Sequence, residues 1–211
     1  MKNKIFIGIT SVALFMTSCG DADSGKEGEG EKDPNGQQDP STSNEADLTG
    51  LREFDMTPYD LNAIIYIPEK YYTDENQEQK FEQPVITHNE GEAEWTITMK
   101  SDKNFNLVIT DWGDIAQSVA DKKQQHVDEN TIYDYKYEEE TEEYMLYSRV
   151  LKSENTTLED VDMTTLPTHH CYVVKVIDGM YITGETNTMG DFYKVSAKTM
   201  MNCVRGMKST L

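Results

Sequence analysis

The stretch from residue 20 to residue 44 sets the first limit on what this chain can fold into. It has no aromatic residue and one apolar side chain, Ala22, among Gly, Ser, Asp, Glu, Pro and Gln. Such a composition buries too little apolar surface to offset the entropy lost on folding, so we expect a flexible tether here. Between Cys19 and Glu53 the chain has ten acidic and three basic residues, and their net repulsion should extend the tether.

The residues ahead of the tether have the plan of a secretory signal. Lys2 and Lys4 precede an apolar stretch from Ile5 to Phe15, and small polar residues follow it. The stretch is about half of the roughly 20 residues that span a bilayer as a helix, so it predicts no permanent transmembrane anchor. We therefore interpret residues 1–18 as a signal peptide and residues 19–53 as the tether.

The sequence Met16-Thr17-Ser18-Cys19 resembles the lipobox of bacterial lipoproteins, in which an apolar and two small residues precede a modified cysteine. It departs from the family at Met16, where leucine is commonest. The resemblance implies that Cys19 is diacylated on sulfur, that the signal is cleaved before it, and that the new amino terminus usually receives another acyl chain. Two or more acyl chains give stable anchoring, which predicts an outer-membrane lipoprotein of the cell envelope. The alternative is an ordinary signal peptide with an incidental cysteine.

The acidic start of the tether, "CGDAD", bears on the face of the membrane. It resembles the signal by which Bacteroidetes-type bacteria export lipoproteins to the outer face of the outer membrane, although Gly20 and Ala22 interrupt the acids. Surface display and a periplasm-facing anchor both stay open.

The charge of the chain limits its partners. The net charge is −20, and loss of Lys2 and Lys4 with the signal would make the protein more acidic. Phosphate backbones and anionic lipid headgroups repel such a protein, so we predict no nucleic-acid partner. Cations, basic proteins and neutral ligands stay open, and the acids also serve simply to keep a tethered domain soluble.

Residues 54–211 are long enough for a single domain with its own core. Short runs rich in β-branched and aromatic residues predict four strands, in "NAIIYIP", "QPVITHN", "EWTITMK" and "FNLVITD". The segment "DWGDIAQSVADKKQQHV" then predicts a short amphipathic helix, with Asp114 as the N-cap and Gln117 at the capping-box spacing. Its expected inward face consists of Ile115, Val119, Ala120 and Val127.

Two hairpins and a terminal helix are expected next. The segment "TIYDYKYEEETEEYMLYSRVLK" contains two alternating runs joined by a six-residue acidic tip, and "HCYVVKVIDGMYITGETN" turns at Asp178-Gly179. An apolar stripe at helical spacing then predicts the terminal helix; it consists of Ala197, Met200, Met201, Val204 and Met207. We interpret these methionines as core rather than as an adaptable binding surface.

This order of elements predicts an α+β domain, with a mainly antiparallel sheet of about seven or eight strands covered by two helices. The order is similar to the PsbP-like α/β/α sandwich of a photosystem accessory subunit and of many single-domain bacterial lipoproteins of unknown role. The resemblance covers residues 54–208 as a pattern of elements. It includes no diagnostic motif, so it assigns no functional residue.

The cysteines of the domain are a candidate disulfide. Cys171 lies in a predicted strand and Cys203 beside the terminal stripe, so a bond between them would tie helix to sheet in an oxidising compartment. The alternative is that both are small buried apolar groups. A catalytic thiol would need partial exposure and a nearby base, for which His169 and His170 are the neighbours in sequence.

The histidine pair does not predict a metal site. Successive side chains of a strand point to opposite faces, so His169 and His170 cannot both bind one ion without His88, His126 or distant acids. The chain lacks H-E-x-x-H, paired C-x-x-C, EF-hand, G-x-S-x-G, phosphate-loop and dinucleotide-binding patterns. We therefore predict no metal, no cofactor and no catalytic residue.

Alternating tyrosines are the candidate partner-binding residues. Tyr133, Tyr135 and Tyr137 should share one face of a strand, whereas Tyr144 and Tyr147 on the partner strand should point to opposite faces. They are either sheet core beneath a helix or an exposed platform for a sugar, a peptide or a protein.

The sequence favours a non-catalytic accessory or binding module for an envelope protein, because that function needs only features that the sequence contains. One alternative is a carrier of a small apolar ligand, which predicts a cavity between sheet and helix. Another is a hydrolase of unrecognised type, which predicts a cleft of polar groups with shifted pKa values around His169 and His170.

Overall fold

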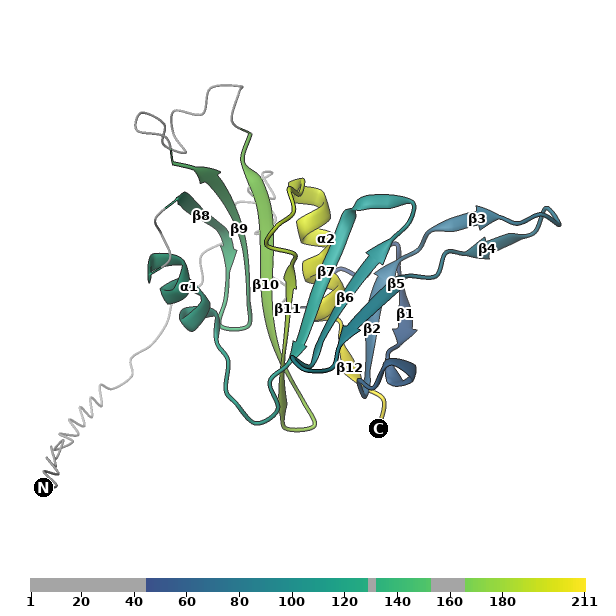
Figure 1. The fold of residues 1–211 in the computed structure, drawn as a ribbon, viewed down its shortest axis with the longest axis horizontal. Helices are drawn as coiled ribbons and strands as arrows, with labels where there is room; N and C mark the ends of the chain where they lie inside the picture. Colours follow the sequence, from purple (N-terminus) through teal and green to yellow (C-terminus); the bar gives the residue numbers. More distant parts are fainter. Residues whose placement is uncertain (1–44, 129–131, 153–165) are drawn as a thin grey trace, which may run out of the picture. The chain divides into compact units, whose positions relative to one another are not determined.

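The computed structural model describes residues 45–128, 132–152 and 166–211 (Figure 1). The predicted signal peptide, Cys19 and the tether as far as Asn44 lie outside the described residues. Within the described ranges, no helix has both the length and the apolar character needed to cross a membrane.

A seven-stranded antiparallel sheet forms the centre of the fold, in the order β5-β6-β7-β11-β10-β9-β8. Its strands are β5 (Val85–Asn89), β6 (Glu94–Met99), β7 (Asp102–Asp111), β8 (Tyr133–Glu140), β9 (Tyr144–Leu151), β10 (Thr168–Ile177) and β11 (Met180–Thr186). The sheet confirms the predicted α+β class. It contains three of the four strands predicted from the first apolar runs, and the fourth, "NAIIYIP", lies in a different sheet. The PsbP-like sandwich stays a prediction.

Helices α1 (Val119–Asp128) and α2 (Lys194–Arg205) pack on opposite faces of this sheet. Alternate side chains of β10 point to the two faces, and Cys171 and Val173 join the main core with α2. Tyr172 and Val174 join a smaller cluster with Val119 of α1. The predicted stripe is confirmed as core, since all five of its residues are buried, four of them on α2 and Met207 just beyond its end.

A second, three-stranded sheet completes the main core beside α2. It contains β1 (Leu51–Asp55), β2 (Ala63–Pro68) and β12 (Lys208–Ser209), and a short 3-10 helix, η1 (Thr57–Tyr59), follows β1. Strand β2 is the "NAIIYIP" strand. Strand β1 begins three residues before the expected domain boundary at residue 54, because Leu51 and Phe54 both pack against the main core.

A two-stranded arm extends from the sheets and was not predicted. It consists of β3 (Tyr71–Thr73) and β4 (Gln79–Phe81), which pair only with each other in the described fold (Figure 1). The strands are too short and too polar to show a period of two in the sequence.

The predicted start of the first helix is wrong. Gly113 lies in a turn, with a φ of +61°, and its backbone N–H donates to the Asp111 carboxylate. The helix has therefore not begun at Asp114. Ser118 caps it instead: its Oγ accepts the N–H of Asp121 at 3.1 Å and donates to the Asp121 carboxylate at 2.6 Å. This is the serine half of a capping box, because the Asp121 carboxylate returns to the Ser118 hydroxyl rather than to its backbone N–H.

The two predicted hairpins are confirmed, with one correction. Asp178 and Gly179 both have positive φ, 52° and 84°, as a two-residue type I′ turn requires. Strand β8 runs to Glu140, so the first turn is three residues long rather than a six-residue tip. Thr141 fixes that turn, because its Oγ1 accepts the N–H groups of Glu143 and Tyr144.

Candidate functional site

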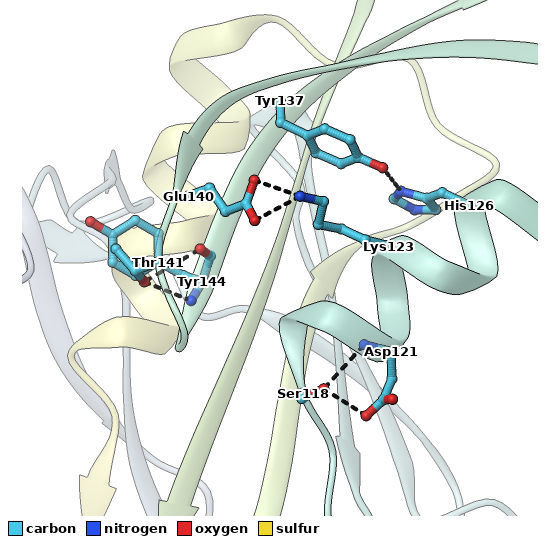
Figure 2. Close-up of polar contacts among 8 residues, drawn as sticks. All are labelled: Ser118, Asp121, Lys123, His126, Tyr137, Glu140, Thr141 and Tyr144. Atoms are coloured by element: carbon cyan, nitrogen blue, oxygen red, sulfur yellow. Dashed lines mark hydrogen bonds and ion pairs between the residues drawn. The ribbon is translucent and has the colours of Figure 1, made fainter. Parts of the chain in front are cut away.

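A groove of about 900 Å³ lies between α1 and the turn end of the β8–β9 hairpin (Figure 2). We call it the α1 groove. Helix α1 contributes the apolar side chains of Val119, Ala120 and Val127 to its lining. The hairpin contributes Tyr137 and a polar rim of Glu140, Thr141 and Glu142.

Two ion pairs hold α1 against the sheet, and one of them lies at the groove. Lys123 Nζ lies 2.7 and 2.9 Å from the two carboxylate oxygens of Glu140, and 4.6 Å from the centre of the Tyr137 ring (Figure 2). Lys122 Nζ lies 2.7 Å from Glu185 on β11 in a partly buried pair. Partial burial makes the second pair more costly to break than an exposed one.

His126 is the buried centre of an aromatic cluster beneath α1. Its ring stacks on Tyr135, with 4.2 Å between ring centres, and contacts Tyr147 at 4.7 Å. His126 Nδ1 lies 3.2 Å from the hydroxyl oxygen of Tyr137 (Figure 2). Tyr147 in turn stacks on His170, 5.5 Å away. The cluster therefore joins α1 to three neighbouring strands of the sheet.

Burial keeps both histidines of this cluster neutral. It lowers the pKa of His126 to about 4, and the charges of Lys122 and Arg149 act in the same direction. Burial and the Arg149 charge likewise lower the pKa of His170 to about 3. Hydroxyl groups of Thr186 and Thr168 lie 2.9 and 3.1 Å from the two ring nitrogens of His170. A buried neutral imidazole with both nitrogens engaged is a packing group rather than a general base.

The tyrosines lie on the faces that their spacing predicts. Tyr133, Tyr135, Tyr137 and Tyr147 form one connected set of rings, whereas Tyr144 packs against the main core on the other face. Tyr147 is only 2% exposed, and the first three are half-buried. We call the connected rings of Tyr133, Tyr135, Tyr137 and Tyr147 the tyrosine ladder. Most of its surface is buried, and Tyr137 lines the α1 groove. A partner-binding role for these residues stays a prediction.

The cysteines are not arranged as a nucleophile. Cys171 and Cys203 are free thiols in the structure, both fully buried, so the candidate disulfide is not formed there. Burial raises the pKa of each thiol far above its usual range. A neutral thiol without solvent access is a poor nucleophile.

His169 lies on the opposite face from His170 and pairs with an acid. Its Nδ1 is 3.3 Å from Glu138 Oε1, and Lys194 of α2 binds the other oxygen of Glu138. Burial opposes ionisation of Glu138, but the hydrogen bond and charge of Lys194 keep its pKa below the usual value. Among the described residues, no hydroxyl or thiol forms a hydrogen bond with His169, so the structure contains no nucleophile activated by this ring there.

His88, which a metal site would have had to recruit, lies away from the other histidines. His88 stacks on Trp95 in β5 and β6, at the opposite edge of the sheet from β8. In the part of the chain that the structure describes, no three side chains of His, Cys, Asp or Glu are grouped as metal ligands.

Two exposed apolar features were missed by the sequence argument. Val127, expected to face inward, is 64% exposed on the outer wall of the α1 groove, because His126 takes the inward position. The arm carries Tyr71, Tyr72 and Phe81, all exposed, with 4.6 Å between the ring centres of Tyr71 and Phe81. The only signal in the sequence is the aromatic residue at each end of "YYTDENQEQKF".

Comparison with known proteins places the chain in no family. No protein-family model matches it, and no curated protein matches its sequence. The chemistry of the chain's own residues is therefore the basis for its function: an open apolar groove with an acidic rim can bind an apolar side chain that is flanked by positive charge.

Proposed function

We propose that the chain is a lipid-anchored protein of the cell envelope, attached through acyl chains on Cys19, whose folded part is a non-catalytic binding module for an envelope protein. The observation that carries the proposal is the α1 groove. Val127 is largely exposed there, although it is an apolar residue on a short helix that packs by its other face. Exposed apolar side chains within a hollow with a polar rim are typical of interaction sites.

Charge selects the kind of partner. Glu140 and Glu142 lie on the rim, and Lys123 is already paired with Glu140. The chain's own tether is acidic, and a second copy of the chain carries the same net charge of −20, so both are repelled. The occupant that fits is a segment of another protein, with an apolar side chain for the groove and a basic one for Glu142.

The buried groups support binding rather than hydrolysis. The two histidines of the aromatic cluster are neutral and packed, and the two thiols are sealed from solvent. A carrier function between sheet and α2 finds little support either. At Gly184 of β11 an added Cβ would lie 2.4 Å from Val204 Cγ2, so helix and sheet are in direct contact there.

The groove is tested with two short peptides of alternating sequence, one of Lys and Leu and one of Glu and Leu. Both are titrated into the ¹⁵N-labelled full chain carrying Cys19→Ala. We expect the basic peptide alone to bind, with amide shifts on α1 and on residues 140–142. Val127→Ser should weaken binding about fivefold, the loss expected for one exposed methyl-rich contact.

The matched control is Ile115→Ser, because Ile115 is 61% exposed and does not line the groove. It should bind the basic peptide as the parent chain does. Equal binding of the two peptides, or equal loss of affinity in both variants, would contradict the proposal.

The anchor is tested separately by metabolic labelling with an alkyne analogue of palmitate. We expect the wild-type chain to be labelled and to sediment with membranes, and Cys19→Ser to lose both properties. Labelling that survives Cys19→Ser would rule out this cysteine as the lipid attachment point.

A further inference from the structure

A second hollow lies at the other end of the tyrosine ladder. It has a volume of about 670 Å³ and is formed where the ends of β8, β9 and β10 meet the start of α2. We call it the Arg149 cavity. Its lining includes Tyr133, Arg149, Leu166, His169, Phe192 and Tyr193. Aromatic and aliphatic side chains dominate, and the volume lies within the roughly 300–1,000 Å³ of small-molecule sites.

Arg149 is an incompletely satisfied cation in this cavity. Its guanidinium carbon lies 4.5 Å from the centre of the Tyr133 ring, and one terminal nitrogen donates to the carbonyl of Thr188. Its Nε is buried without a hydrogen-bond partner. No carboxylate among the described residues forms an ion pair with it. That absence is notable in a chain with 39 acidic and 19 basic residues.

The surrounding charges favour an anion at this position. Helix α2 starts at the cavity wall with Tyr193 as an N-cap that makes no side-chain hydrogen bond, and its first turn has no acidic residue. The free N–H groups of a helix start add partial positive charge. Glu138, which contacts the cavity residues His169 and Lys194, is paired with both of them rather than with Arg149. Asp191 also lines the cavity and is exposed to solvent.

We propose that the Arg149 cavity binds a small organic carboxylate with an apolar or aromatic body. The carboxylate would accept hydrogen bonds from Arg149, whose planar donors match its two oxygens. The body would lie against Tyr133, Phe192 and Tyr193. This site is separate from the α1 groove and takes a different class of ligand.

The test compares 2-naphthoate with 2-naphthylmethanol, which has the same ring system and no charge. Binding is measured by isothermal titration calorimetry on the full chain carrying Cys19→Ala. We expect the acid to bind at least tenfold more tightly than the alcohol, and Arg149→Gln to remove this preference. Lys80→Gln is the control, because Lys80 is a cation on the distant β4 strand; it should leave both affinities unchanged.

A second variant separates binding from folding, since Arg149 also contacts Tyr133 and Thr188. Leu166 is 74% exposed at the cavity, so Leu166→Glu adds a negative charge there without disturbing the core. It should weaken the acid about tenfold and the alcohol little, whereas Leu166→Gln should change neither much. The proposal is overturned if neither probe binds, if acid and alcohol bind equally, or if Leu166→Glu leaves the affinity for the acid unchanged.

Discussion

At the scale of single residues, His126 decides the character of the α1 side of the sheet. A purely apolar cluster would need only volume, whereas this one depends on a ring that must stay neutral between Tyr135, Tyr137 and Tyr147. His170 on β10 must also stay neutral, because it stacks on Tyr147 of the neighbouring strand β9. The stability of the fold is therefore expected to depend on pH through these two histidines, which are packed in their neutral form.

We predict that stability falls as the pH is lowered from 7 to 5. Unfolded histidine titrates near 6.5, and folded His126 and His170 have pKa values of about 4 and 3. In this window the unfolded chain binds more protons than the native one, so the free energy of unfolding decreases with falling pH. The expected loss is about 1–2 kcal/mol for each histidine, measured by urea unfolding at several pH values.

His126→Phe tests the cause, because it keeps a ring in the stack and removes one titrating group. Its stability should fall about half as steeply over the same range. Tyr133→Phe retains both histidines and should keep the wild-type slope. Carboxylates titrate mainly below pH 5, and the comparison of the two slopes removes any contribution that they make equally to both proteins. An unchanged slope in His126→Phe would show that another group is responsible.

At the scale of elements, the capping residue sets where α1 begins and so which side chains face the groove. We predict that Ser118→Ala destabilises the protein by about 1 kcal/mol, because Asp121 loses its N–H acceptor at the helix start. Hydrogen exchange of the α1 amides should rise with it. Asp114→Ala, at the position that the sequence favoured, should leave both quantities unchanged. The reverse pattern would restore Asp114 as the cap.

The contact between β11 and α2 depends on the absence of one side chain. A Cβ on Gly184 would approach Val204 Cγ2 to 2.4 Å and Cγ1 to 2.7 Å. We expect Gly184→Ala to cost about 1–3 kcal/mol in thermal or urea unfolding, because helix and sheet must move apart. Adding Val204→Ala to it should recover part of that loss. Gly91→Ala is the control, since its Cβ would meet only Asn89 Oδ1, at 3.7 Å; equal effects at the two glycines would refute the packing argument.

The elements also show what sequence patterns can predict. The sheet strands, the Asp178-Gly179 turn and the α2 stripe were predictable because burial on one face imposes a period on the side chains. Helix α1 was misplaced because polar contacts hold it, through His126, Lys122 and Lys123, and no apolar period marks them. The Arg149 cavity had no local signal, because its lining comes from three strands and a helix start that only the fold brings together.

At the scale of the whole molecule, acidic charge is spread well beyond the pairs that offset it. The described residues contain few ion pairs, and most of them are exposed, so each contributes about 0–1 kcal/mol. The excess of acids over bases leaves a net charge of −20. Repulsion among unpaired carboxylates should therefore outweigh the attraction within the pairs. The α1 groove and the Arg149 cavity differ in local charge, so the first fits a basic partner and the second an anion despite the acidic net charge.

This balance predicts that salt stabilises the protein. Raising NaCl from about 10 mM to about 150 mM shortens the screening length from about 30 Å to about 8 Å, which weakens long-range repulsion more than contact pairs. We expect the melting temperature to rise by about 2–4 °C, corresponding to about 1 kcal/mol. Glu142→Lys with Glu143→Lys, two exposed positions at the hairpin turn, should raise stability at low salt and reduce the gain from added salt. A melting temperature that falls with salt would mean that the ion pairs of α1, rather than the net charge, dominate the electrostatics of the fold.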